Sequence, residues 1–134
     1  IYAREALGTA RAHTMARTGT LSRHGIAFAL HSDYTMAPAQ PLNSAWVAVN
    51  RKNVAGDIVG PEERVSVEQA LRAVTTDAAY VLGLEHEVGT LQSGKRADFT
   101  VLEQDPFEVP PEDLRDIKIW GTVFGGTPAP LKDN

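Results

Sequence analysis

The chain has 134 residues, of which 43% are hydrophobic and 22% are charged, and its formal net charge is -4. This composition is typical of a globular protein, and the acidic balance argues against a nucleic-acid-binding surface, which needs a basic patch. The sequence has no cysteine, which excludes disulfides, thiolate metal sites and a cysteine nucleophile, and no apolar stretch approaches the roughly 20 residues that span a bilayer.

The first 24 residues predict helical structure and no targeting signal. The chain begins at Ile1 without a basic region and apolar signal core, so we expect a start made by truncation, processing or incomplete sequencing. The compartment stays open, with the cytoplasm favoured. A helix is expected within Ala10–His24, interrupted near Gly19 and closed by Gly25, because glycine readily takes the left-handed conformation at a helix end.

A short apolar run, Ile26–Leu30, lies between Gly25 and the polar residues His31, Ser32 and Asp33. Such a run predicts a strand that is buried on both faces, as in parallel sheets covered by helices. The order of helix, glycine and apolar strand fits one unit of an α/β architecture.

Two further helices are predicted after this strand. The first begins at Pro41 and ends near Arg51. The second covers Ser66–Gly83 and opens with a capping box formed by Ser66 and Gln69. We expect the apolar positions of the first helix to face the core, and these are Leu42, Ala45, Trp46 and Val49.

The character of the sequence changes after residue 83. Short strands are predicted over Val88–Leu91, Ala97–Leu102 and Ile117–Phe124, and the residues from Gly125 onward are expected to form a Gly/Pro-rich tail. The chain is therefore expected to divide into an α/β part, residues 1–83, and a β part, residues 84–134. A (β/α)8 barrel takes about 250 residues, so a chain of this length cannot close one.

The clearest candidate for chemistry is Asp33, at the carboxyl end of the predicted buried strand. Ligands bind at that edge in α/β sheets and barrels. A carboxylate there can ligate a divalent metal and accept a proton from metal-bound water. The alternative is that the Asp33 side chain caps a turn.

The roles of His31 and Tyr34, which lie near Asp33 in the sequence, each have two possible interpretations. His31 is expected on the same face of the strand as Asp33, where it either lines a pocket or packs in the wall. Tyr34 lies in a loop that either overhangs the site and shapes specificity or only connects elements. Glu62 and Glu63 are interpreted as a charge cluster before a helix, not as catalytic carboxylates.

Three segments resemble the C-terminal part of the amidohydrolase superfamily, most closely its family 3 branch. Gly25–Asp33 (GIAFALHSD) is similar to the eighth barrel strand, which ends in Ser-Asp. Ser66–Gly83 resembles the helix before the return to a β domain. Val88–Leu102 (VGTLQSGKRADFTVL) is similar to the signature that re-enters that domain, and Glu112–Gly126 matches the ending of the branch.

The resemblance implies the end of a TIM (β/α)8 barrel followed by part of a composite β-sandwich. It also implies hydrolysis of an amide or N-formyl-like, non-peptide C–N bond in a small molecule, with Asp33 as metal ligand and general base. The family's His-x-His pair is absent from this chain. We therefore expect a divalent metal, with zinc favoured, to be held by the complete protein and not by this chain alone.

The alternative function is a non-catalytic α/β-plus-β module with a structural or partner-binding role. Under the hydrolase interpretation, the isolated chain is expected to be inactive. The edges of the predicted strand Ile26–Leu30 would then be unpaired, which favours self-association between copies. Neither a nucleic acid nor a membrane is expected as a partner.

Overall fold

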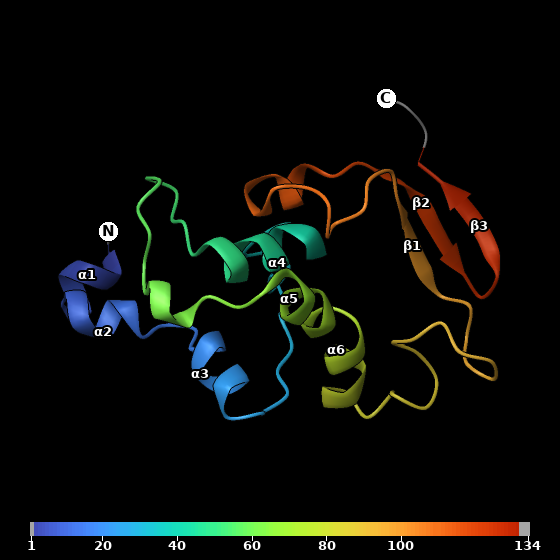
Figure 1. Ribbon diagram of the computed structural model, residues 1–134, viewed down its shortest axis with the longest axis horizontal. Coiled ribbons are helices and arrows are strands. Elements are labelled where there is room, and N and C mark those ends of the chain that lie inside the picture. The colour runs from blue at the N-terminus through green and yellow to red at the C-terminus, as the bar shows by residue number, and fades with distance from the viewer. Residues whose placement is uncertain (1, 132–134) are drawn as a thin grey trace.

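The computed structural model describes residues 2–131, with helices in the first part of the chain and a three-stranded sheet at one end of the molecule (Figure 1). No helix in this range is long and apolar enough to cross a bilayer. In chain order, the elements are α1 (Tyr2–Leu7), α2 (Thr9–His13), α3 (Thr18–Arg23), α4 (Pro41–Asn50), η1 (Pro61–Glu63), α5 (Val67–Ala73), α6 (Thr76–Val81), β1 (Phe99–Leu102), η2 (Pro111–Asp116), β2 (Ile119–Phe124) and β3 (Thr127–Pro130).

The helix predicted within Ala10–His24 forms as two short helices, α2 and α3. The interruption lies at residues 14–17, and the expected break at Gly19 is wrong because Gly19 is inside α3. Glycine is required there by close packing, since a Cβ would lie 2.7 Å from the carbonyl oxygen of Glu62. Gly25 has φ +65°, which confirms its predicted place after the helix end.

Helix α4 follows its sequence prediction closely. Pro41 occupies the first turn, where a missing N–H costs nothing. Arg51 ends the helix in the left-handed conformation, with φ 57°. The predicted apolar stripe faces the core, and Ala45, Trp46 and Val49 are buried.

The predicted helix Ser66–Gly83 is also two helices, α5 and α6. Its capping box is confirmed: the Ser66 hydroxyl accepts from the Gln69 backbone N–H at 3.1 Å, and the Gln69 side chain accepts from the Ser66 N–H at 2.9 Å. The break comes at Thr75, whose hydroxyl donates to the Leu71 carbonyl oxygen at 2.7 Å. A threonine bonded to the preceding turn in this way bends a helix.

The segment Ile26–Leu30 is extended but is not a strand, so that prediction is wrong. Its Leu30 N–H donates to the Ala73 carbonyl oxygen at 3.0 Å, and Phe28 and Leu30 pack half-buried against the core. Ile26 is 53% exposed. A strand requires a neighbouring strand, and no segment among residues 2–131 pairs with this one.

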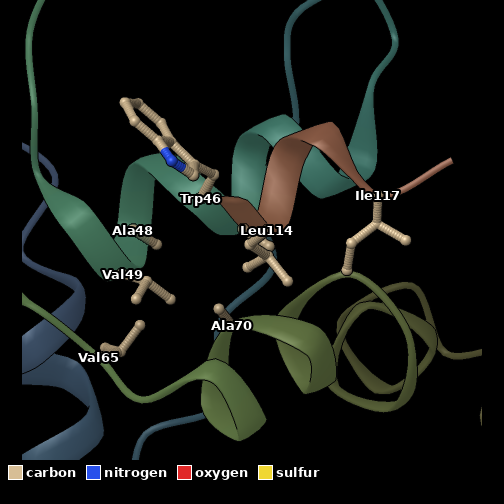
Figure 2. Packing of buried hydrophobic residues seen from close by; sticks show 8 residues of the cluster. Trp46, Ala48, Val49, Val65, Ala70, Leu114 and Ile117 are labelled. Carbon is tan, nitrogen blue, oxygen red and sulfur yellow. The ribbon is translucent and has the colours of Figure 1, made fainter. Parts of the chain in front are cut away.

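The core lies where α4, α5 and η2 meet (Figure 2). Leu114 of η2 is completely buried, which contributes roughly 1.5–3 kcal/mol. The Trp46 indole N–H donates to the Glu112 carbonyl oxygen at 2.6 Å, and the Arg115 guanidinium lies 4.0 Å from the ring centre. The core thus joins residues from both sides of residue 83: Ala45, Trp46, Ala48, Val49, Val65, Ala70, Leu114 and Ile117.

The sheet after residue 83 is antiparallel, in the order β1-β2-β3. Phe99 pairs with Val123 and Phe124 with Thr127. The strands predicted near residues 97–102 and 117–124 are confirmed as β1 and β2 with shorter bounds.

Two predictions after residue 83 are wrong. Val88–Leu91 forms turns, because Gly89 has φ +93° and Val88 donates its N–H back to the Leu84 carbonyl oxygen at 3.0 Å. The predicted tail instead forms β3. Gly125 and Gly126, with φ +56° and +82°, supply the two-residue hairpin turn that brings β3 back along β2.

Candidate functional site

The candidate site lies where the extended segment 26–32 ends and the connection to α4 begins. Leu30 fixes this segment to the Ala73 carbonyl oxygen of α5, and Phe28 helps to seal it against the core. Beyond Leu30 the segment returns to the surface, and Asp33 is exposed. Core packing therefore determines where the Asp33 carboxylate emerges.

The Asp33 backbone makes the local turn. Its φ is +52°, its N–H donates to the His31 ring Nδ1 at 3.1 Å, and its carbonyl oxygen accepts from the Met36 N–H at 2.7 Å. None of the hydrogen bonds among residues 5–131, whose side chains the structure describes, reaches the Asp33 carboxylate. The turn is thus closed by main-chain atoms, which leaves both carboxylate oxygens available to a ligand.

His31 lies beside Asp33 and holds its backbone. Since Nδ1 accepts the Asp33 N–H, a neutral His31 carries its proton on Nε2, which is then a donor for another group. A hollow of about 190 Å³ has His31, Ser32, Gln40 and Ser44 in its wall. The structure therefore puts His31 at a small cavity next to Asp33, and the role predicted for either side chain in chemistry stays a prediction.

Tyr34, the third predicted site residue, is next to Asp33 in the chain. Its side chain is 77% exposed and packs against none of the core residues. It lies within the turn that Asp33 and Met36 close.

The described residues do not fit a complete metal site. Among residues 2–131, no three His, Asp or Glu side chains come together to hold an ion. Divalent metals in proteins need three or more such ligands, and Asp33 is one. A carboxylate such as that of Asp33 is a ligand that zinc and similar ions accept, but a site built on it would need further ligands.

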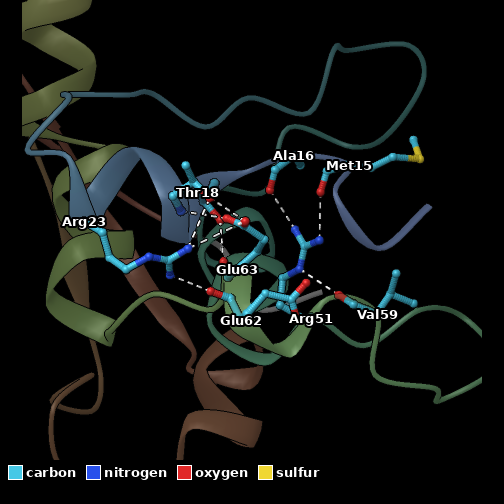
Figure 3. A network of polar contacts seen from close by, with 9 residues as sticks. Met15, Ala16, Thr18, Arg23, Arg51, Val59, Glu62 and Glu63 are labelled. Atoms are coloured by element: carbon cyan, nitrogen blue, oxygen red, sulfur yellow. Dashed lines mark hydrogen bonds and ion pairs between the residues drawn. The ribbon is translucent and has the colours of Figure 1, made fainter. Parts of the chain in front are cut away.

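A second polar cluster was not recognised from the sequence (Figure 3). Glu63 is buried, and its two carboxylate oxygens accept from the Thr20 backbone N–H at 2.7 Å and the Thr20 hydroxyl at 2.6 Å. Arg23 lies 3.8 Å from the same carboxylate and donates to the Glu62 carbonyl oxygen at 2.7 Å. The hydroxyl of Thr20 holds the pKa of Glu63 below its ordinary value, against the opposing effect of burial.

Arg51 occupies the other end of this cluster. Its guanidinium donates to the carbonyl oxygens of Met15, Ala16 and Val59 at 2.8–2.9 Å, as Figure 3 shows. Burial lowers the pKa of Arg51, and the Glu63 charge opposes that shift. The side chains of Glu63 and Arg51 make their hydrogen bonds within the protein, so they stabilise the fold and are not candidates for catalysis. In the sequence this cluster is indicated only by the Thr18-x-Thr20 pair, whose role becomes clear once the fold brings η1 beside it.

Comparison with known proteins gives a family for the chain. A family model described as "Amidohydrolase family" matches residues 1–129. N-substituted formamide deformylase from Arthrobacter pascens is 33% identical over 102 residues, 76% of this chain and 19% of that protein. The putative amidohydrolase YtcJ from Bacillus subtilis is 34% identical over 123 residues, 90% of this chain and 23% of that protein.

A plant protein is similar as well. Protein LONG AFTER FAR-RED 3 from Arabidopsis thaliana is 36% identical over 99 residues, 73% of this chain and 17% of that protein. The chain thus spans about a fifth of the length of these curated relatives.

Proposed function

This chain belongs to the amidohydrolase family, and from that premise we propose that the complete protein hydrolyses a non-peptide carbon–nitrogen bond in a small molecule. An amide or N-formyl-like substrate is favoured, since one relative is named as a formamide deformylase. Residues 25–33 would correspond to the last barrel strand and its catalytic end, and residues 84–134 to part of the β domain beside the barrel.

The observation that carries the proposal is the state of the Asp33 carboxylate. It is exposed, it receives no hydrogen bond from residues 5–131, and a backbone turn holds its position. A carboxylate kept out of internal hydrogen bonds can accept a proton during a reaction. In contrast, both oxygens of Glu63, the one Asp or Glu that is buried among residues 5–131, accept hydrogen bonds from Thr20.

Asp33 would act as a general base. It accepts a proton from the attacking water while the water oxygen bonds to the substrate carbonyl carbon. It then passes that proton to the departing nitrogen as the C–N bond breaks, which leaves a carboxylic acid and an amine.

Amidohydrolases are generally metal-dependent, and we favour zinc. The ion would lower the pKa of bound water and polarise the carbonyl group. Because no three His, Asp or Glu side chains come together among the described residues, the remaining ligands would come from outside them.

The proposal is tested by incubating the complete protein with N-substituted formamides and acetamides and measuring amine release by mass spectrometry. We expect turnover that is lost after dialysis against a chelator and restored by Zn²⁺. The metal-free protein with its fold intact by circular dichroism serves as the control. If metal-replete protein releases no amine from any of these amides, the non-catalytic module becomes the better interpretation.

A further inference from the structure

The turn that follows Asp33 contains two residues in a conformation that L-amino acids rarely adopt. Asp33 has φ +52° and Thr35 has φ +117°. Positive φ is tolerated by aspartate but is a genuine outlier for a β-branched residue such as threonine. The strain is concentrated within two residues of the proposed general base.

Glycine would remove most of this strain. The Met36 N–H donates to the Asp33 carbonyl oxygen at 2.7 Å, which closes a four-residue turn with Thr35 as its third residue. Turns with positive φ at that position ordinarily use glycine there. Strained residues are retained mainly where the surrounding geometry serves function. Thr35 also restricts the range of backbone conformations open to the turn, and glycine would enlarge that range.

Tyr34 lies between these two positions of positive φ. Its side chain is 77% exposed, and that of Met36 is 82% exposed, so neither contributes to the core. The bond from the Asp33 N–H to the His31 ring fixes the near side of the turn. The backbone of Tyr34 is thus restrained on both sides, while its exposed ring packs against none of the core residues.

We propose that Tyr34 determines substrate specificity by packing against an apolar, preferably aromatic, substituent on the amine side of the substrate. This inference rests on the proposed function. Asp33 would deliver a proton to the departing nitrogen, and Tyr34 follows Asp33 within the same turn, so its ring is proposed to reach the substituent on that nitrogen. A tyrosine offers a large apolar face with a polar tip, and the same turn contains the adaptable thioether side chain of Met36.

The test compares two amides in the complete, metal-replete protein. They share one acyl group and differ in the nitrogen substituent, methyl in one and benzyl in the other. We expect the wild type to favour the benzyl substrate. Tyr34→Ala should lower the benzyl-to-methyl ratio of kcat/KM about tenfold, the scale of a lost aromatic contact, whereas Tyr34→Phe should retain it.

Thr35→Gly tests the contribution of strain. It should lower the benzyl-to-methyl ratio of kcat/KM, because a more flexible turn no longer holds the Tyr34 ring in one position. It should not lower Tm, because the strain at residue 35 is removed. Ala16→Gly is the matched control, since Ala16 also has positive φ, 50°, but lies between α2 and α3. It should leave the ratio unchanged.

Two results overturn the specificity role: an unchanged ratio in active Tyr34→Ala, or an equal loss on both substrates. A wild type without preference for the benzyl amide does so too. A wild type that hydrolyses neither amide contradicts the hydrolase assignment itself, and the inference falls with it.

Discussion

Asp33 and Glu63 are carboxylates on short connecting segments, and their surroundings give them opposite roles. Glu63 accepts two hydrogen bonds from Thr20, and its side chain is 4% exposed. The Asp33 carboxylate is exposed and accepts none from residues 5–131. A buried carboxylate with satisfied oxygens stabilises a fold, whereas an open one is available for reaction.

Glu63→Gln should lower the free energy of unfolding by about 1–3 kcal/mol. Glutamine keeps only one acceptor oxygen for the two Thr20 donors and loses the charge that strengthens both bonds and attracts Arg23. Chemical denaturation of the complete protein measures the change. Glu62→Gln is the matched control: that side chain is exposed, so its effect should stay within about 0.5 kcal/mol. Equal effects of the two substitutions would contradict the role of Glu63.

The stabilisation from Glu63 should also depend on pH. Its pKa is lowered in the folded protein, chiefly by the Thr20 hydroxyl, from an ordinary value of 4.5. The unfolded state therefore binds the proton more readily, and the contribution is complete above pH 4.5 and lost as pH falls through the folded pKa. Denaturation curves below pH 4.5 should accordingly bring wild type and Glu63→Gln closer together.

At the scale of elements, Gly19 shows how a contact between α3 and η1 overrides helix propensity. Alanine in a helix interior is ordinarily favoured over glycine by about 1 kcal/mol. Here a Cβ would lie 2.7 Å from both the Glu62 carbonyl oxygen and the Glu63 Cα, so backbone would have to move. Gly19→Ala should lower Tm, while Arg11→Ala, at an exposed position of α2, should not. A higher Tm for Gly19→Ala would show that α3 and η1 are not packed this closely.

The elements that the sequence predicted correctly are those with local signals. Pro41 begins α4, Ser66 and Gln69 cap α5, and Gly25 follows α3. The Ile26–Leu30 strand failed because its apolar run indicates burial, while a strand also needs a partner from a distant part of a chain. At the site, Asp33, His31 and Tyr34 could be proposed from their order, but the bond from the Asp33 N–H to His31 and the strain at Thr35 depend on backbone angles that no pattern encodes.

The sheet has two chemically different edges. The Leu131 N–H donates to the Trp120 carbonyl oxygen at 2.9 Å, so every second residue of β3 directs its backbone N–H and C=O groups toward β2. The residues between them, Pro128 and Pro130, direct their backbone groups away from β2, toward the open edge of the sheet. Proline has no N–H, so this edge offers no donor to a further strand. The edge of β1 has no such block, and any extension of the sheet is expected there.

At the scale of the whole molecule, one core joins the helices to the segment that leads into the sheet. Trp46 of α4 and Leu114 of η2 lie in the same cluster. The extended segment 26–32 borders this core and ends at Asp33. The chain spans about a fifth of its curated relatives, so a complete active centre would draw on other parts of the protein. Self-association of the isolated chain stays a prediction.

The most direct test of this account is the kcat for amide hydrolysis by Asp33→Asn in the complete protein. Asparagine keeps the shape of the side chain but cannot act as a general base, so kcat should fall on the order of 10²–10⁴-fold with Tm unchanged. Asp57→Asn, at another exposed aspartate, should leave kcat unchanged. A folded Asp33→Asn protein that retains wild-type kcat would contradict the assignment of residue 33 to the reacting centre.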